Sequence, residues 1–545
     1  MSEFRNSFGE NIFRHKYALS DTQTWAEKSQ DIVNSVCQNL MPKDMADTLA
    51  QHITSFRFVP GGRYIYYAGR AASFYNNCYL LKGEEDTREE WGNLTKRSSD
   101  CLMSGGGIGI DYSCFRPAGA PLGRTGGDAS GPIPLMRSIN EIGRNVMQGG
   151  SRRSAIYASL NWRHGDARAF LAAKDWEGMM LSDKYSIWDS KQYDFNAYAP
   201  LDMTNISLNY DNAFLDRIQN GQLPPIFLDN VRQAMKSGEP GFSFNFGDKE
   251  NETLRNACTE VTSEDDSDVC NLGSVNLAAC NDINEFREVV RLASGFLVCG
   301  TITADLPYDK VYAVRKKNRR LGLGLMGIHE WLLQRGYKYE MNAELRQWME
   351  VYREESERAA RSLCDRLSIS HPVAFRAIAP TGTIGILAGT TTGIEPLFAV
   401  AYKRRYLTDG TKWKYEYVVD STAEAIIQST GVDPNNIETS LSLAADPERR
   451  IRFQADIQDY VDMAISSTIN LPKWGSELNN EDHVNSFAST LAKYAPRLRG
   501  FTVYPDGARG GQPLTSVTYK EATKHKGVVF EENSDQQCKD GVCGI

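Results

Sequence analysis

The sequence lacks several features that would assign it to large protein classes. No apolar run reaches the roughly 18 residues that cross a bilayer. The first residues are mostly polar and do not form the apolar core of a secretory signal peptide. The net charge is −8, which argues against a nucleic-acid-binding surface as the main function. We therefore expect a cytoplasmic protein that binds neither membranes nor nucleic acids.

The cysteine pattern does not fit a disulfide scaffold either. Eleven cysteines spread over 545 residues, an odd number, point to free thiols in a reducing compartment. We interpret six of them as packing residues: Cys37, Cys101, Cys114, Cys280, Cys299 and Cys364. Near the C-terminus, Cys538 and Cys543 have only His525 as a further soft ligand, so we expect no metal site.

The most informative stretch is Asn256-Ala257-Cys258-Thr259-Glu260, with an amide, a thiol and a carboxylate at alternate positions. If this segment is extended, all three side chains project to one face. They would then bring a hydrogen-bonding amide, a reactive sulfur and a base into one small volume. Taken alone, Cys258 is better explained as a buried thiol that packs as a small hydrophobe.

Other motifs accompany this stretch in a fixed order. They are Asn76-Asn77-Cys78, Cys270-Asn271-Leu272-Gly273-Ser274 and the pair Cys538 and Cys543. Together they resemble the catalytic subunit of ribonucleotide reductase, from about residue 55 to the end of the chain. The resemblance implies an α/β fold, a ten-stranded α/β barrel of two five-stranded halves with Cys258 on a central finger loop. The sequence is similar to a short form of this subunit that has no N-terminal regulatory ATP-cone domain.

Hydrophobic periodicity gives a coarse domain organisation. Helical spacing over 22–36 and 46–53 predicts a helical N-terminal region over residues 1–55. Strand-forming residues predict strands at 63–67, 77–81 and 500–504 within a barrel domain over 56–517. The polar, charged residues 518–545 are typical of a flexible redox tail.

The resemblance also implies roles for the motif residues. Cys258 would carry a thiyl radical that removes the 3′-hydrogen of the ribose. Glu260 would act as general base on the 3′-hydroxyl, and Asn256 would orient the sugar. Cys78 and Cys270 would supply two electrons for loss of the 2′-hydroxyl as water, and the tail pair would reduce the resulting disulfide. The alanine at 257 replaces the family's usual proline and the threonine at 259 its usual glycine, which we expect to loosen the local backbone.

Three further segments resemble the family's nucleotide sites. Thr381, Gly382, Thr383 and Ile384 resemble the loop for the substrate phosphates, although an ordinary turn capped by threonine has the same pattern. Asp86 and the loop residues Arg152 and Arg153 resemble the site of a dNTP or ATP specificity effector. Asp86 is also compatible with a helix N-cap near Thr87, and the arginines with plain solvent exposure. Effector loops of this kind meet across an interface, so a homodimer is expected.

The radical source stays open between two classes. One class uses a separate metal-containing small subunit and a tandem tyrosine relay, for which Tyr504 is a candidate, although Pro505 follows it. The other class uses adenosylcobalamin, and the block Thr502 to Arg509 resembles that class. In either case the tail cysteines imply a thioredoxin- or glutaredoxin-like reductant as partner.

Three other functions are compatible with parts of the sequence. A nicotinamide-dependent oxidoreductase would rest on Ser104 to Gly109, which lacks the dinucleotide-binding spacing. A glycyl-radical enzyme would share the barrel but needs a glycine-radical motif near its C-terminus, where only the cysteine pair is found. A non-catalytic nucleotide-binding protein could keep the phosphate loops but would have no use for the cysteines.

Overall fold

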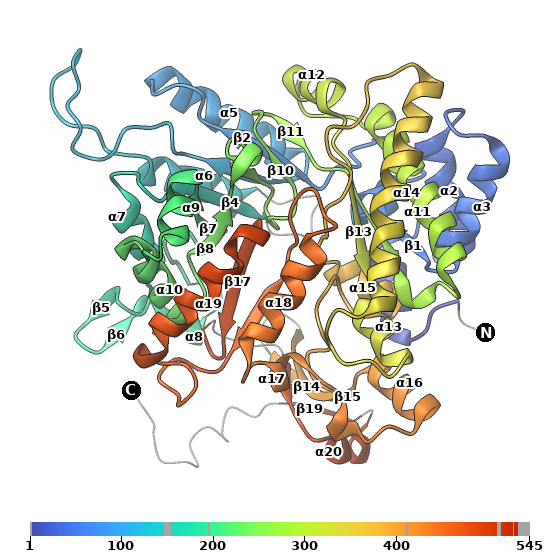
Figure 1. Ribbon diagram of the computed structural model, residues 1–545. Coiled ribbons are helices and arrows are strands. Elements are labelled where there is room, and N and C mark those ends of the chain that lie inside the picture. Colours follow the sequence, from blue (N-terminus) through green and yellow to red (C-terminus); the bar gives the residue numbers. More distant parts are fainter. Residues whose placement is uncertain are drawn as a thin grey trace.

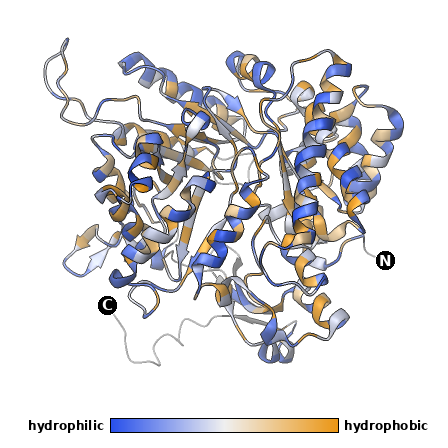
Figure 2. Ribbon diagram, viewed as in Figure 1, coloured by the Kyte–Doolittle hydropathy of each residue, from blue (hydrophilic) through white to orange (hydrophobic). Residues whose placement is uncertain are grey.

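The computed structural model describes residues 3–146, 154–194, 197–408, 412–508, 514–526 and 528–531. Two strand-and-helix halves lie next to each other, and the first helices of the chain cover the outer side of one half (Figure 1). The apolar faces of the covering helices turn toward the sheets and their polar faces turn outward (Figure 2).

The first half is a parallel sheet in the order β2-β3-β4-β7-β8. Its strands are Cys78–Lys82 (β2), Gly107–Asp111 (β3), Ile156–Asn161 (β4), Thr204–Tyr210 (β7) and Gly241–Phe244 (β8). Its helices are Arg88–Met103 (α5), Ile133–Asn145 (α6), Ala167–Ala172 (α7), Asn212–Gln219 (α9) and Pro225–Ser237 (α10). A hairpin of Met180–Ser182 (β5) and Tyr185–Ser186 (β6), followed by Ile187–Tyr193 (α8), extends from it.

Side chains alternate between the two faces of these strands, as a period of two requires. In β7, Ile206 and Leu208 pack in the core shared with the helices. The intervening Ser207 and Asn209 are also buried, but on the opposite face, and Asn209 Nδ2 donates to Ser159 Oγ of β4 at 3.0 Å. The inner face is therefore polar at β4 and β7.

The second half runs in parallel through Leu272–Asn276 (β12), Gly322–Met326 (β13), residues 376–378, Thr468–Leu471 (β16) and Gly500–Pro505 (β17). Residues 376–378 join it through single bridges, Leu323 to Arg376 and Ile378 to Ile465. Its helices are Ile283–Thr303 (α11), Asp309–Asn318 (α12), Ile328–Gln334 (α13), Ala343–Leu367 (α14), Gly382–Ala388 (α15), Ser440–Leu443 (α17), Pro447–Gln458 (α18) and Val484–Tyr494 (α19).

The halves meet on two sides. β17 pairs antiparallel with β8 on one side. On the other, Asp268–Val269 (β11) pairs antiparallel with β2, and the chain then continues through Cys270 into β12. The expected α/β fold with two five-stranded halves is confirmed.

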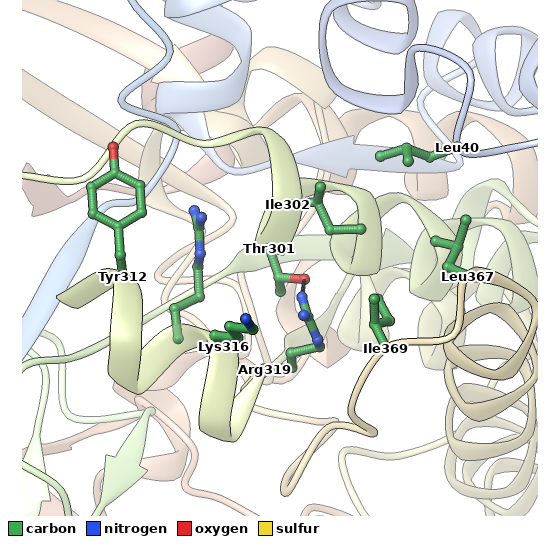
Figure 3. A pocket seen from close by; sticks show the side chains of 9 residues that line it. Leu40, Thr301, Ile302, Tyr312, Lys316, Arg319, Leu367 and Ile369 are labelled. Atoms are coloured by element: carbon green, nitrogen blue, oxygen red, sulfur yellow. Dashed lines mark hydrogen bonds between the residues drawn. The ribbon is translucent and has the colours of Figure 1, made fainter. Parts of the chain in front are cut away.

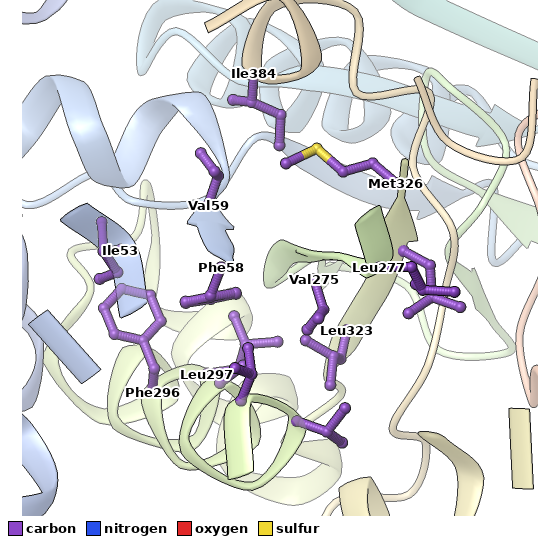
Figure 4. Close-up of a cluster of buried hydrophobic side chains, with 14 of the residues drawn as sticks. Ile53, Phe58, Val59, Val275, Leu277, Phe296, Leu297, Leu323, Met326 and Ile384 are labelled. Carbon is purple, nitrogen blue, oxygen red and sulfur yellow. The ribbon is translucent and has the colours of Figure 1, made fainter. Parts of the chain in front are cut away.

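The N-terminal region packs against the second half. It contains Ser7–Ile12 (α1), the π-helical turn Phe13–Tyr17, Trp25–Cys37 (α2) and Lys43–Thr54 (α3). α2 starts with a capping box in which the Thr24 hydroxyl and the Glu27 carboxylate satisfy each other's backbone amides. Ile53 of α3 lies with Phe296 of α11 and with Phe58 and Val59 of Phe58–Pro60 (β1) in one apolar cluster (Figure 4).

The strand predicted at 63–67 is wrong, because Gly62–Tyr67 forms a helix (α4). Tyr64 and Ile65 of this helix are fully buried, and the Arg63 guanidinium donates to the carbonyls of Ser104 and Gly105. These tertiary contacts override the strand propensity of the tyrosines.

A small antiparallel sheet in the order β18-β14-β15-β19 was not predicted. Its strands are Leu514–Ser516 (β18), Ala401–Thr408 (β14), Lys412–Val419 (β15) and Val529–Glu531 (β19), accompanied by Ser421–Thr430 (α16) and Tyr519–Lys524 (α20). The first part of the expected flexible tail is thus structured, since α20 and β19 begin after residue 518 and pack on this sheet. The tail sequence is mostly polar, so it gave no sign that Ala522 is buried, where it packs with Ala401 and Val419.

Among the described residues, no helix is both long enough and apolar enough to span a bilayer.

Candidate active site

A short hairpin carries the central motif into the barrel. Leu254–Arg255 (β9) and Thr262–Ser263 (β10) pair antiparallel, and residues 256–261 form the tip. A Cβ at Gly109 of β3 would lie only 1.7 Å from the Arg255 carbonyl oxygen, and a Cβ at Gly107 would lie 3.1 Å from the Ala257 Cβ. The hairpin therefore lies directly against the inner face of β3, and the expected central finger loop is present.

The tip is a tight turn and not the extended segment that would project the three motif side chains to one face. The Thr259 amide donates to the Asn256 carbonyl at 2.9 Å, and the Val261 amide donates to Asn256 Oδ1 at 3.0 Å. Thr259 has φ of +73°, a left-handed conformation that a β-branched residue rarely adopts. The threonine in place of glycine thus strains this turn and does not loosen it.

A buried arginine fixes the base of the finger. Arg255 is 1% exposed, and it donates to Asn245 Oδ1 at 2.8 Å and to the Arg499 carbonyl at 3.0 Å. Burial and the nearby Arg499 lower the pKa of Arg255 to about 9, and Glu252 partly offsets them. The sequence analysis missed this residue, although its position directly before Asn256 was a usable signal.

Cys78 and Cys270 face each other across the join between the halves. The Cys270 amide donates to the Cys78 carbonyl at 3.1 Å, and the Cys78 amide donates to Cys270 Sγ at 3.0 Å. Burial and the neighbouring Cys78 thiol raise the pKa of Cys270 well above its ordinary value. Cys270 is therefore held as a thiol, and two hydrogen bonds fix it opposite Cys78.

The finger tip reaches this pair of thiols. The position that a Gly107 Cβ would occupy is 3.3 Å from Cys78 Sγ as well as 3.1 Å from the Ala257 Cβ, so Cys78 and the tip border the same small space. Cys258, the next residue, is half-buried, whereas Asn256 and Glu260 are fully buried. The structure thus brings the five predicted catalytic residues into one region.

Glu260 sits in an apolar environment. Burial raises the pKa of Glu260 to about 8, with a further contribution from Cys78 and a smaller opposing one from Asn256. Its backbone carbonyl accepts from the Ala464 amide at 2.8 Å, which ties the tip to the second half. A carboxyl with such a pKa can exchange a proton near neutral pH.

Three buried polar residues behind Cys270 were not predicted. Asn76 Nδ2 donates to the Cys270 carbonyl at 2.6 Å, and the Tyr64 hydroxyl donates to Asn271 Oδ1. Asn76 and Asn271 stand inside the quoted motifs, which was a signal, whereas Tyr64 lies in the segment predicted as a strand.

The phosphate-loop candidates surround the start of α15. Thr381 has φ of +52°, and its hydroxyl accepts from the Gly393 amide at 2.8 Å. The amides of Gly382, Thr383 and Ile384 make no hydrogen bond within the described part of the chain. Ile384 anchors the loop by packing with Val59 and Met326 (Figure 4).

The effector candidates are only partly within the described residues. Asp86 Oδ2 accepts from Arg116 Nε at 2.6 Å, and both side chains are partly exposed. Thr87, and not Asp86, caps α5 through its side chain. Arg152 and Arg153, like Cys538 and Cys543, lie outside the described residues.

Tyr504 lies on β17 opposite Asn470 of β16 and is half-buried. Its neighbours Val503 and Pro505 are buried on the other face of the strand. β17 therefore presents a single phenol toward the inner side of the barrel at this level.

The packing prediction holds for Cys37, Cys101, Cys280, Cys299 and Cys364, which are buried, but Cys114 is exposed. In the described ranges, no group of three or more His, Cys, Asp or Glu residues is arranged to hold a metal ion.

A separate hollow of about 370 Å³ lies between the C-terminal ends of α11, α12 and α14 (Figure 3). Arg315 and Arg319 line it, and Arg319 Nη1 donates to Thr301 Oγ1 at 3.2 Å. Arg315 donates to the Ala304 carbonyl at the end of α11 at 2.7 Å. The negative ends of the helix dipoles offset these cations, so the hollow requires no anionic ligand.

Comparisons with known proteins agree with this geometry. The model of the family "Ribonucleotide reductase, barrel domain" matches residues 76–223, 226–355 and 372–495, which is more than half of the chain. A vitamin B12-dependent ribonucleoside-diphosphate reductase of Mycobacterium tuberculosis is 26% identical over 93% of this chain and 80% of its own length.

Two solved structures share the fold. A B12-dependent class II ribonucleotide reductase superposes with a TM-score of 0.70 at 16% identity, covering 96% of this chain and 95% of its own. The class Id ribonucleotide reductase alpha subunit of Actinobacillus ureae superposes with a TM-score of 0.71 at 14% identity, covering 92% and 97%. The resemblance inferred from the motifs is confirmed: the chain belongs to the ribonucleotide reductase family.

Proposed function

We propose that this chain converts ribonucleotides to 2′-deoxyribonucleotides with Cys258 as the radical-bearing thiol. The observation that carries the proposal is the finger, whose tip bears the half-exposed Cys258 and borders Cys78, which faces Cys270. A thiol beside a dithiol combines the two requirements of the reaction, a hydrogen-atom abstractor and a two-electron reductant.

We assign the role of each catalytic residue from its position in the site and, for Glu260, from its protonation state. The Cys258 sulfur removes the 3′-hydrogen, and Glu260, whose pKa lies near 8, takes the 3′-hydroxyl proton. The 2′-hydroxyl leaves as water with a proton from the dithiol, and Cys78 and Cys270 give up two electrons and form a disulfide. Asn256 orients the sugar through its side-chain amide, and the 3′-hydrogen finally returns to carbon from Cys258.

Substrate phosphates bind at Thr381 to Ile384 in this proposal. The exposed Gly382 and the loop amides that find no partner among the described residues support it, because backbone N–H groups at a loop of this kind suit phosphate oxygens. The matched family region 372–495 includes the loop.

Reduction of the disulfide is assigned to Cys538 and Cys543, with a thioredoxin- or glutaredoxin-like protein as electron donor in the cytoplasm. Thiol–disulfide exchange needs a second accessible dithiol, because Cys78 and Cys270 are buried.

The effector is assigned to the region of Asp86, Arg152 and Arg153 in a homodimer. Support comes from the partly exposed Asp86–Arg116 pair at the start of α5. A carboxylate there can accept from a ribose hydroxyl, and a guanidinium can bind a phosphate.

For the radical source we propose adenosylcobalamin, which supplies a carbon-centred radical when bound. The residues of the chain fit direct transfer of the radical to the half-exposed Cys258 better than transfer through a relay of tyrosines. A relay through adjacent tyrosines needs two phenols, and Pro505 follows Tyr504. The B12-dependent relative from Mycobacterium tuberculosis supports this choice.

The test is deoxyribonucleotide formation by the purified chain with a dithiol, an effector deoxynucleotide and adenosylcobalamin, without other proteins. We expect turnover that requires the cobalamin and disappears in C258S, while C258S still binds ribonucleotide. Activity only after addition of a metal-loaded small subunit would refute the cobalamin assignment. Turnover by C258S would refute the radical role of Cys258.

A further inference from the structure

The segment that joins the barrel halves, Cys270-Asn271, is held by hydrogen bonds at several backbone and side-chain groups. The Cys270 carbonyl accepts from Asn76 Nδ2 at 2.6 Å, and the Asn271 carbonyl accepts from the Gly322 amide at 2.7 Å. The Asn271 side chain accepts from the Tyr64 hydroxyl and donates weakly to the Leu297 carbonyl. A residue anchored in this way cannot shift its backbone without breaking buried hydrogen bonds.

Tyr64 of α4 is held next to this segment by the residues around it. Its ring is 0% exposed, stacks on Tyr75 with ring centroids 5.0 Å apart, and packs at a tilt against Phe296 with centroids 4.9 Å apart. A Cβ at Gly300 of α11 would lie 1.9 Å from the Tyr64 hydroxyl oxygen and 3.1 Å from Asn271 Oδ1. The helix thus has a glycine where the Tyr64–Asn271 hydrogen bond needs the space.

We propose that Tyr64 is a positioning residue that acts through Asn271 to hold Cys270 in its dithiol geometry and so makes the Cys78–Cys270 disulfide easier to reduce. The inference rests on the proposed role of these two cysteines as the electron donors.

The physical basis is the geometry of a disulfide. The sulfurs must approach to about 2.05 Å, with a Cα–Cα separation mostly between about 4.4 and 6.8 Å. In the structure Cys270 Sγ accepts from the Cys78 amide at 3.0 Å, a contact of the separate thiols. The hydrogen bond from the Cys78 amide to Cys270 Sγ stabilises the reduced pair, and a rigid Cys270 backbone keeps the sulfur within reach of this amide. Stabilising the dithiol in this way raises the reduction potential of the pair.

The chain offers a matched pair of variants. Tyr64→Phe removes the hydroxyl that reaches Asn271 and keeps the ring in the stack. Tyr75→Phe removes the neighbouring hydroxyl of the same stack, which contacts the Ser35 carbonyl at 3.4 Å and not Asn271. Asn76→Ser releases the Cys270 carbonyl by an independent route.

The measurement is the reduction potential of the Cys78–Cys270 pair in the full chain, set by glutathione or dithiothreitol buffers and read by alkylation and mass spectrometry. We expect Tyr64→Phe and Asn76→Ser to stabilise the disulfide roughly tenfold, a potential lower by about 30 mV. Tyr75→Phe should match the wild type. Circular dichroism confirms that each variant is folded.

Kinetics give a second readout. With pre-reduced enzyme and no added reductant, Tyr64→Phe should form product in a single turnover at close to the wild-type rate. In steady state its rate should fall because re-reduction becomes slower, and a higher dithiol concentration should restore it. A Tyr64→Phe potential equal to that of Tyr75→Phe, or a defect that no dithiol concentration relieves, would overturn the inference. Wild-type protein that forms no Cys78–Cys270 disulfide after turnover would instead overturn the proposed function.

Discussion

Replacing Gly109 by alanine tests whether the finger is held against β3. The added Cβ would lie 1.7 Å from the Arg255 carbonyl oxygen and 2.8 Å from the carbonyl carbon. Both are backbone atoms of the finger, so no side-chain rotation relieves the overlap. The hairpin or the strand has to move by more than 1 Å.

The expected cost is larger for catalysis than for stability. Overpacking of this kind lowers the free energy of unfolding by about 1–3 kcal/mol. A 1 Å displacement of a reacting group lowers the rate by about 100-fold, and Cys258 lies three residues beyond Arg255 on the same hairpin. We therefore expect kcat of G109A to fall about 100-fold, with a smaller change in KM because the phosphate loop is on another element.

The assay is steady-state formation of deoxyribonucleotide, with kcat and KM determined separately and thermal unfolding measured alongside. Gly500→Ala is the control, since a Cβ at this strand position meets nothing closer than 3.9 Å. Without a clash, alanine in place of a strand glycine stabilises slightly. A G109A protein with wild-type kcat and a raised melting temperature would show that the finger does not lie against β3.

Three further predictions concern Glu260, Asp86 and Tyr504. The pKa of Glu260 is about 8 in the folded protein against an ordinary 4.5, so the unfolded chain releases this proton first as pH rises. Stability should therefore fall between about pH 4.5 and 8, and E260Q should remove this part of the pH dependence in chemical denaturation. For the same reason kcat/KM should rise with pH toward 8, and a rate that is flat from pH 6 to 9 would contradict the role as base. D86N should weaken effector binding about tenfold in equilibrium dialysis without changing effector-free activity, and equal binding would remove Asp86 from the site. Y504F should keep adenosylcobalamin-dependent activity within about twofold, whereas complete loss would identify Tyr504 as a radical relay.

Local sequence patterns predicted much of the fold. The strands predicted at 77–81 and 500–504 correspond to β2 and β17, because strand-forming residues are properties of short segments and can be read without knowing the partners. The helices α2 and α3 follow from helical spacing in the same way. Segment 63–67 failed because its tyrosines favour strands, while the buried contacts of Tyr64 and the hydrogen bonds of Arg63 impose a helix.

The sequence by itself determined the chemistry that is available: a thiol, a carboxylate and an amide at Cys258, Glu260 and Asn256, with two more thiols at Cys78 and Cys270. Only the tertiary structure decided how these groups interact. Cys78 and Cys270 face each other because β11 pairs with β2, and the tip reaches them because β3 has glycines where the finger backbone passes. The pKa of Glu260 depends on burial by residues far away in the chain. Such effects arise from contacts between distant segments, and no local pattern encodes them.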